Sequence, residues 1–279
     1  MLIINSLHQL NGQFDRVSLA LGTFDGVHLA HRFVIGRTVE WSSLYNGTSM
    51  VLTFANHPLS IIAPQRIPPQ LQTVGGKTDQ IRKLGIKVLV RIPFTRKLLH
   101  LPPADFVQLL ATRIRPGHIV VGPNYSFGDK GAGTPDMLTQ LASRYGIQTE
   151  ICPAVYQDGV MVSSTAIRRL IAAGEVEQAA VLLGRNYDLS GTVVTGDRRG
   201  RSLGFPTANL RVAPQMLLPG KGVYAVRVKY DRKLYDGVCN IGINPTFSHD
   251  GLRVETHILD FDRDIYGKKL TIQFLGRLR

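Results

Sequence analysis

Cysteine is scarce in this sequence, since its 279 residues include only Cys152 and Cys239. The two lie far apart and in no spacing typical of metal ligands, so neither a disulfide framework nor a zinc site is expected. No apolar run approaches the roughly 18 residues that cross a bilayer. The segment Met1–His8 lacks the basic start and long apolar stretch of a signal peptide. These absences predict a soluble, cytoplasmic protein that does not bind membranes.

Acidic residues are also few, with 20 Asp and Glu against 33 Lys and Arg, which gives a formal net charge of +13. Such an excess favours anionic partners: phosphates, nucleotides or nucleic acid. The charge is spread evenly, because residues 1–184 carry 17 basic and 11 acidic side chains and residues 185–279 carry 16 and 9. Small phosphorylated ligands explain this distribution as well as nucleic acid does. We therefore expect no nucleic-acid partner, and a nucleic-acid-binding protein is kept as a distant alternative.

The first part of the chain alternates short apolar runs with segments of helical spacing. Strands are predicted at 17–21, 49–54, 87–92, 118–121 and 148–151, and helices at 31–44, 77–84, 104–114 and 137–145. Strands separated by helices indicate βαβ crossovers and a mostly parallel sheet. Ligands of such sheets bind at the carboxyl ends of the strands.

The last part of the chain follows another pattern. Two helices are predicted at 165–173 and 176–183, and strand-like segments follow at 193–194, 222–229, 235–241, 252–261 and 269–275. No helical pattern separates these strands, which is typical of a small antiparallel barrel. We place the domain boundary near residue 184.

A glycine turn with two histidines follows the first strand. Val17–Leu21 runs into Gly22-Thr23-Phe24-Asp25-Gly26-Val27-His28-Leu29-Ala30-His31. A strand, a glycine turn and a helix start aim backbone N–H groups and the helix dipole at one point, which suits a phosphate. His28 and His31 are three residues apart, so both can donate to the same anion. A zinc pair would need a third ligand, and none follows at suitable spacing.

Two further segments combine hydroxyl groups with positive charge. Ser163, Ser164 and Thr165 can cap a helix and face a phosphate, with Arg168 in the first turn; the alternative is a plain helix cap with a surface arginine. The segment 191–210 contains four glycines and three arginines between strands, and it lacks the Gly-Lys-Ser/Thr of a Walker A loop. It could wrap a polyphosphate or form a flexible basic loop.

The extended stretch Pro206-Thr207-Ala208-Asn209 follows that loop. Because side chains alternate along an extended chain, the oxygens of Thr207 and Asn209 point to the same side. Two such oxygens can share a hard cation such as Mg²⁺.

These motifs resemble those of a known enzyme family. The segment 22–31 looks like the nucleotide-binding motif of HxGH nucleotidyltransferases, and 121–128 and 162–168 resemble later motifs of the adenylyltransferase half of prokaryotic bifunctional riboflavin kinase/FMN adenylyltransferases (FAD synthetases). The segments 206–209, 222–226, 240–247 and 254–261 resemble the flavokinase half. The resemblance covers essentially the whole chain. It implies an α/β plus all-β fold: a Rossmann-like nucleotidyltransferase domain at 1–184 and a flavokinase β-barrel at 185–279.

The family's activities and site residues are implied for this chain in the same way. Riboflavin and ATP would give FMN, and FMN with a second ATP would give FAD and pyrophosphate, with no covalent enzyme intermediate. Glu255 would be the base that accepts the proton of the riboflavin 5′-hydroxyl; the alternative is a surface salt-bridge glutamate. His28 and His31 would stabilise the leaving pyrophosphate.

The implied binding residues fall into four groups. Nucleotide contacts of the adenylyltransferase are Gly22, Phe24, Asp25, His28, His31, Asn124, Ser163, Ser164, Thr165 and Arg168. Nucleotide contacts of the kinase are Gly196, Arg201, Gly204, Pro206, Thr207 and Asn209. Flavin contacts are Asn240, Gly242 and Thr246, and the Mg²⁺ ligands are Thr207 and Asn209. The sequence indicates nothing about the oligomeric state.

This chain departs from the family pattern at three places. Ala30 stands where the motif has glycine, and Phe54-Ala55-Asn56-His57-Pro58 lacks the family's acidic residue. A chain with riboflavin kinase activity and a degraded adenylyltransferase is therefore the alternative. His57 is either a ligand contact or a structural turn histidine. The family usually continues into a helical tail that helps to cover the flavin, whereas this sequence ends with 274–279. Either the sequence is truncated, or the flavin pocket is more open and weaker than usual.

Overall fold

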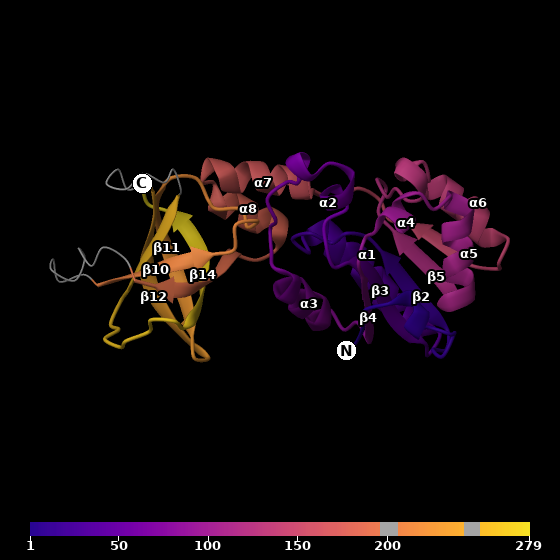
Figure 1. The fold of residues 1–279 in the computed structure, drawn as a ribbon, viewed down its shortest axis with the longest axis horizontal. Helices are drawn as coiled ribbons and strands as arrows, with labels where there is room; N and C mark the ends of the chain where they lie inside the picture. Colours follow the sequence, from indigo (N-terminus) through magenta and orange to yellow (C-terminus); the bar gives the residue numbers. More distant parts are fainter. Residues whose placement is uncertain (196–205, 243–251) are drawn as a thin grey trace. The chain divides into compact units, whose positions relative to one another are not determined.

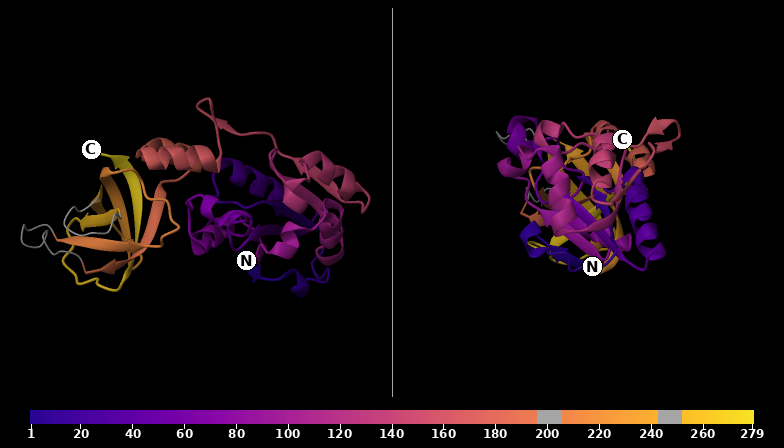
Figure 2. Two further views of the ribbon diagram at one scale, coloured as in Figure 1. Left: turned by 45° about the horizontal axis from the view of Figure 1, so that its top comes forward. Right: turned by 90° about the vertical axis from the view of Figure 1, so that its right-hand side faces the viewer.

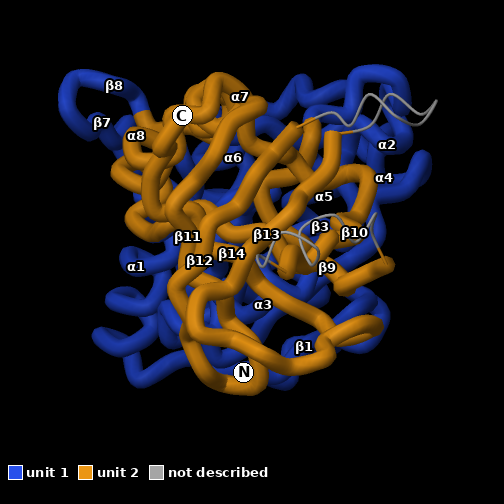
Figure 3. The backbone as a smooth tube through the Cα atoms, turned by 90° about the vertical axis from the view of Figure 1, so that its left-hand side faces the viewer, with its two compact units in different colours: residues 1–68, 74–161 blue, residues 69–73, 162–279 orange. Residues whose placement is uncertain are grey.

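The computed structural model describes residues 1–195, 206–242 and 252–279. It divides into two compact units (Figure 3). Unit 1 comprises Met1–Pro68 and Val74–Met161, and unit 2 comprises Pro69–Thr73 and Val162–Arg279. The boundary near residue 184 that the sequence suggests stays a prediction, and each unit is described by itself.

Unit 1 is built on a six-stranded sheet in the order β1-β4-β3-β2-β5-β6 (Figure 1). Every neighbouring pair of strands is parallel, as the alternation of strands and helices predicts. The strands are β1 (Leu2–Ile4), β2 (Val17–Leu21), β3 (Thr48–Phe54), β4 (Val88–Ile92), β5 (Pro116–Val121) and β6 (Gln148–Ile151). The sequence missed β1, because its three residues form a strand only by pairing with the distant β4.

Helices cover both faces of this sheet. Successive strand residues face opposite sides, so Ala20 and Val51 join the core under α1 and α3, while Leu19 and Met50 join the core under α5 and α6. These helices are α1 (Leu29–Leu44), α3 (Val74–Lys83), α5 (Pro103–Arg113) and α6 (Pro135–Ser143). Two short helices, α2 (Leu59–Ile62) and α4 (Arg96–Leu99), and 3₁₀ turns at Leu7–Gln9, Pro64–Arg66 and Asp129–Gly131 complete the unit. A hairpin of β7 (Tyr156–Gln157) and β8 (Val160–Met161) projects from it (Figure 2).

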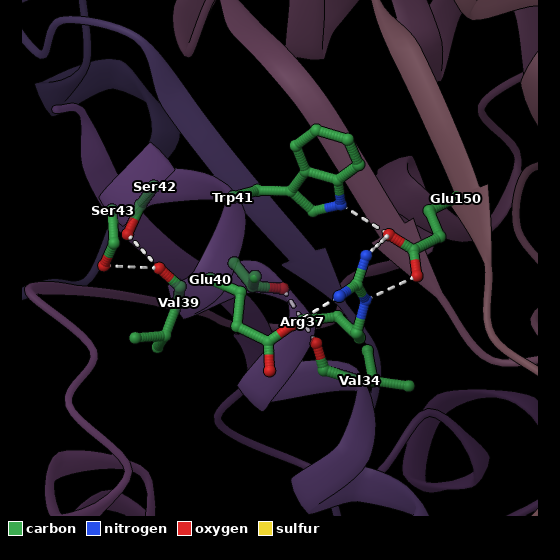
Figure 4. A network of polar contacts seen from close by, with 9 residues as sticks. Val34, Arg37, Val39, Glu40, Trp41, Ser42, Ser43 and Glu150 are labelled. Carbon is green, nitrogen blue, oxygen red and sulfur yellow. Dashed lines mark hydrogen bonds and ion pairs between the residues drawn. The ribbon is translucent and has the colours of Figure 1, made fainter. Parts of the chain in front are cut away.

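A polar network fastens α1 to the edge strand β6 (Figure 4). The Arg37 guanidinium donates to both carboxylate oxygens of Glu150, over 2.8 and 3.2 Å, and the Trp41 indole N–H donates to the same carboxylate. Burial opposes ionisation of Glu150, but these hydrogen bonds prevail and lower the pKa of its carboxyl group. Arg37 also forms an ion pair with Glu40 on the same helix. One guanidinium group therefore binds a carboxylate on α1 and a carboxylate on β6.

Unit 2 contains a closed barrel with the strand order β10-β13-β12-β11-β14-β9. All of its strand pairs are antiparallel, which confirms the predicted architecture. Its interior is filled by alternate residues, as along β13, where Val254, Thr256 and Ile258 are buried. The strands are β9 (Tyr187–Val194), β10 (Thr207–Val212), β11 (Gly222–Tyr230), β12 (Lys233–Gly242), β13 (Arg253–Ile258) and β14 (Lys269–Arg277).

Two helices precede the barrel and belong to the same unit. α7 (Ser164–Ala173) and α8 (Val176–Leu183) agree with the predicted helices, and α8 packs on β9 and β14. The Arg277 side chain donates to the Ala173 carbonyl over 3.2 Å, and its backbone N–H donates to Glu177 over 2.9 Å. These bonds tie the ends of both helices to the last strand.

This packing predicts where a stable fragment that contains the barrel begins. A fragment of residues 185–279 lacks α8, whose Val176, Leu182 and Leu183 side chains are buried. Loss of that contact should lower the free energy of unfolding by about 3 kcal/mol or more relative to a fragment of residues 162–279. Urea denaturation of both fragments measures the difference, and equal stability would favour a boundary near residue 184.

Candidate active sites

The order of the parallel sheet creates a switch point between β2 and β5. From β2 the chain proceeds to β3 on one side, whereas β5 and then β6 lie on the other side. Crevices for ligands form at the carboxyl ends of strands at such points. Gly22 follows β2 and Gly122 follows the neighbouring β5, so the predicted glycine turn and the loop with the exposed Asn124 start side by side.

The turn after β2 is held in an unusual backbone conformation. Phe24 and Val27 have φ angles of +51° and +40°, a left-handed region that a β-branched valine rarely adopts. Such strain costs on the order of 1–3 kcal/mol and persists where the surroundings impose it. A Cβ on Gly22 would lie 2.9 Å from the Phe24 ring, which is itself buried. The buried Phe24 ring therefore lies directly against the backbone of the turn at Gly22.

The two histidines lie at the start of α1. His28 is the N-cap residue, and its Nδ1 accepts the His31 backbone N–H over 3.4 Å. The accepting Nδ1 carries no proton, so the neutral His28 ring has its N–H at Nε2. The two histidine rings stack with centroids 3.6 Å apart, and the Phe24 and His31 rings are nearly perpendicular with centroids 5.3 Å apart. The structure therefore brings the predicted pair together.

His31 is kept neutral by its surroundings. Burial of the ring, the neighbouring His28 and the charge of Lys77 lower the pKa of His31 well below 6.5. Its Nδ1 is buried with no hydrogen-bond partner. At pH 7 the ring can thus contribute one N–H to a ligand and carries no positive charge.

Lys77 is a residue of this site that the sequence analysis missed. Its Nζ, on α3, donates to the carbonyl oxygens of Thr23 and Phe54, each over 3.0 Å. The one local signal was its position after Gly75-Gly76 at the start of a helix. Only the fold brings that helix to the ends of β2 and β3.

Side chains near the positions where this chain departs from the family motif form local hydrogen bonds. The Asn56 side chain donates to Ser60 and to the Phe94 carbonyl, and it accepts the Phe94 N–H over 2.8 Å. The Nδ1 of His57 accepts the Leu59 N–H over 3.1 Å, which supports its interpretation as a turn histidine. Ala30 is the second residue of α1.

The serine motif caps α7 as predicted. The Ser163 hydroxyl accepts the Ala166 N–H over 3.2 Å, and the Arg168 side chain donates to the Pro69 carbonyl over 2.8 Å. These residues belong to unit 2, whereas His28 and Asn124 belong to unit 1. That Ser163, Ser164, Thr165 and Arg168 bind the same nucleotide as the histidines stays a prediction.

In the barrel, three predicted site residues form one row. Asn209 on β10 and Asn240 on β12 both lie directly opposite Glu255 on β13. Residues opposite one another on neighbouring antiparallel strands have Cβ atoms about 4.5–5.5 Å apart. The structure therefore brings Glu255 together with a predicted cation ligand and a predicted flavin contact.

This row lies on the outer face of the barrel. The residues before and after Glu255 point into the core, so Glu255 points outward and is half-buried. Thr207, two residues before Asn209, shares that face and is opposite His257. A carboxylate, a hydroxyl and two amides on one patch suit the positioning of a phosphorylated ligand.

His257 is a second residue that the sequence analysis did not single out. Its Nδ1 lies 2.9 Å from the Pro206 carbonyl oxygen, and because a carbonyl only accepts, Nδ1 is the donor. This bond fixes the backbone just before Thr207. Its position two residues after Glu255 on one strand was the signal in the sequence.

Several predicted residues remain untested by the geometry. Gly196, Arg201, Gly204 and Thr246 lie outside the described residues. Gly242 ends β12 opposite Arg253. Within the described part of the chain, no group of three or more His, Cys, Asp or Glu residues could hold a metal ion. Cys152 and Cys239 are buried free thiols.

Both units match models of known protein families. The FAD synthetase family model matches residues 11–166, and the riboflavin kinase family model matches residues 183–279.

Several curated proteins resemble the whole chain. A bifunctional riboflavin kinase/FMN adenylyltransferase from Listeria monocytogenes is 38% identical and is aligned over 92% of this chain and 82% of its own. Proteins of the same name from Bacillus subtilis and Escherichia coli K12 are 35% and 32% identical, over 98% and 100% of this chain and 87% and 90% of theirs.

A solved structure shares the fold. It is the crystal structure of a protein from Streptococcus pneumoniae named as a macrolide-efflux protein, with a TM-score of 0.90 and 28% identity over 100% of this chain and 90% of that one. That name concerns the pneumococcal protein, whereas both family models and the curated relatives agree on flavin synthesis. No helix among the described residues has the length and apolarity needed to span a bilayer.

The surroundings of His31 predict its titration behaviour. Because burial and two neighbouring groups disfavour its charged form, lowering the pH from 8 to 6 should leave the His31 ring neutral. Imidazole resonances recorded by NMR over this range report the protonation state of the ring. A His31 ring that gains a proton near pH 6.5 would contradict this account.

Proposed function

The chain belongs to the family of bifunctional riboflavin kinases/FMN adenylyltransferases, and from this we propose that it converts riboflavin to FMN and FMN to FAD, with one ATP for each step. The observation that carries the kinase assignment is the row of Asn209, Glu255 and Asn240 on the outer face of the barrel. The adenylyltransferase assignment rests on the stacked histidines at the sheet's switch point. A cytoplasmic location, where ATP is present, suits both reactions.

In the kinase step, the 5′-hydroxyl oxygen of riboflavin attacks the γ-phosphorus of ATP. The bond from that phosphorus to the β–γ bridging oxygen breaks, and ADP leaves. Glu255 accepts the proton of the hydroxyl group, which needs a carboxylate within hydrogen-bond reach. Asn240, which lies opposite Glu255, would contact the flavin. Positioning supplies most of the catalysis in such transfers.

The kinase would use Mg²⁺ held by Thr207 and Asn209. Their hydroxyl and amide oxygens are hard donors on one outer face, with the Glu255 carboxylate next to them, and this donor set fits the ion. When bound, Mg²⁺ neutralises charge on the phosphates. His257 hydrogen-bonds to the Pro206 carbonyl and so restrains the peptide that precedes Thr207.

In the adenylylation step, a phosphate oxygen of FMN attacks the α-phosphorus of the second ATP. The bond to the α–β bridging oxygen breaks, and pyrophosphate leaves with the electron pair. The Nε2–H of His28, the neutral His31 and the N-terminus of α1 offer donors to the departing charge. Contacts from Asn124 and from Ser163–Arg168 to the same nucleotide are part of this proposal.

The first test separates the two activities. Replacing the base in Glu255→Gln should slow FMN formation by about 10²–10⁴-fold and leave FMN-to-FAD conversion intact. Chromatography of the flavins formed from riboflavin, or from FMN, with ATP and Mg²⁺ measures both steps. Asp260→Asn, at an exposed position after β13, is the control. Equal loss of both steps in a folded Glu255 variant would contradict two separate sites.

The second test addresses the alternative that Ala30 and Ala55 suggest, a chain with kinase activity only. With FMN and ATP as substrates, the wild type should release pyrophosphate. His28→Asn keeps an N-cap side chain but removes the Nε2–H, so release should fall by about 10²–10³-fold while riboflavin phosphorylation is retained. A coupled pyrophosphate assay measures the rate. A wild type that phosphorylates riboflavin but releases no pyrophosphate would establish the alternative.

A further inference from the structure

The Lys77 side chain leaves α3 and ends between two strand termini of unit 1. Its Nζ donates to the carbonyl oxygens of Thr23 and Phe54 over 3.0 Å each, and to the Thr53 hydroxyl over 3.4 Å. An ammonium group has three N–H donors and no acceptor. These three acceptors account for all of its donors, so the group ties the turn after β2 to the end of β3.

Among these acceptors, the Thr23 carbonyl belongs to the turn that is proposed to bind the nucleotide. It accepts from Lys77 and also from the Thr53 hydroxyl over 3.0 Å. A peptide unit is planar, so holding this carbonyl also fixes the direction of the Phe24 N–H on the opposite side of the same plane. If the peptide rotated, the carbonyl oxygen could face the crevice, where a phosphate would be repelled. Two donors on one oxygen oppose that rotation.

Charged groups from each neighbouring element face the Lys77 ammonium. Burial and Arg91 on β4 disfavour its charged form, and Asp25 in the turn favours it; the balance lowers the pKa of Lys77 to about 8. His31 on α1 is its other titratable neighbour, and the Lys77 charge helps to keep that ring neutral. The ammonium thus forms at neutral pH and is lost within the range in which the protein can be assayed.

We propose that Lys77 is a positioning residue for adenylyl transfer: its ammonium locks the Thr23–Phe24 peptide and thereby fixes the nucleotide-binding turn between Gly22 and His28. This inference rests on the proposed adenylyltransferase function. It gives Lys77 no contact with the reacting atoms, because its donors are engaged with the protein.

The first experiment compares Lys77→Met with wild type. Methionine keeps the length of the side chain and removes the three donors. We expect kcat/KM for pyrophosphate release from FMN and ATP to fall by about 100-fold at pH 7, the effect of a small misplacement of catalytic groups. Riboflavin phosphorylation in the same sample should be unchanged, which shows that unit 2 is intact, and circular dichroism checks that unit 1 stays folded. Lys83→Met, an exposed lysine of the same helix, is the matched control.

The pH profile separates this role from a purely structural one. Above pH 8 the wild type loses the Lys77 charge and one of its three N–H donors, which weakens the hydrogen bonds to the carbonyls, so its advantage over Lys77→Met should shrink between pH 7 and 9.5. Thr53→Val, which removes the second donor to the Thr23 carbonyl and conserves shape, should lower the same rate by a smaller factor. Equal activity of Lys77→Met and wild type at pH 7, or a gap independent of pH, would overturn the proposal.

An NMR measurement distinguishes failure of this inference from failure of the proposed function. If the wild type released no pyrophosphate, the adenylyltransferase assignment would fail. The position of the ammonium is then tested directly, because Lys77→Met should raise the pKa of His31 by removing a nearby positive charge. An unchanged His31 titration in that variant would contradict the placement of Lys77 on which the proposal depends.

Discussion

Buried backbone N–H and C=O groups at the carboxyl ends of the parallel strands need hydrogen-bond partners, and beyond these ends the sheet no longer supplies them. This constraint shapes the site of unit 1. The Thr23 carbonyl is held by Lys77 and Thr53, the loop after β4 by Asn56, and the first turn of α1 by His28. These partners are side chains from separate segments of the chain, so their hydrogen bonds hold the strand ends and the following loops together. The strained φ angles of the turn persist for the same reason.

The barrel of unit 2 meets a different constraint. Its strands must fill the interior with every second residue, so the intervening residues are free to carry chemistry on the outside. Thr256 is buried in the core, whereas its neighbours Glu255 and His257 lie on the outer face of the barrel. Antiparallel register then sets Asn209 and Asn240 on either side of the carboxylate. The relative positions of these three side chains therefore follow from the backbone hydrogen bonds that set the strand register.

The sequence predicted most strands and helices because their apolar spacing is local. It could not predict β1, whose three residues become a strand only against β4, nor the length of β9, which pairs with both β10 and β14. Among site residues, the motif with His28 and His31 was readable. Lys77 was not, because a lysine on a helix is ordinarily a solvated residue, and only packing of α3 turns this one toward the strand ends.

By itself, the sequence determined the two fold classes, the family resemblance and the order of the motifs, since periodicity, turn residues and short motifs are encoded by neighbouring residues. The tertiary structure alone decided which carbonyl oxygens Lys77 binds, that His31 is neutral, and that Glu255 lies between two asparagines on an outer wall. These properties depend on burial, on strand register and on charges brought together from distant segments. None of them is a property of local sequence, so they arise only when the chain has folded.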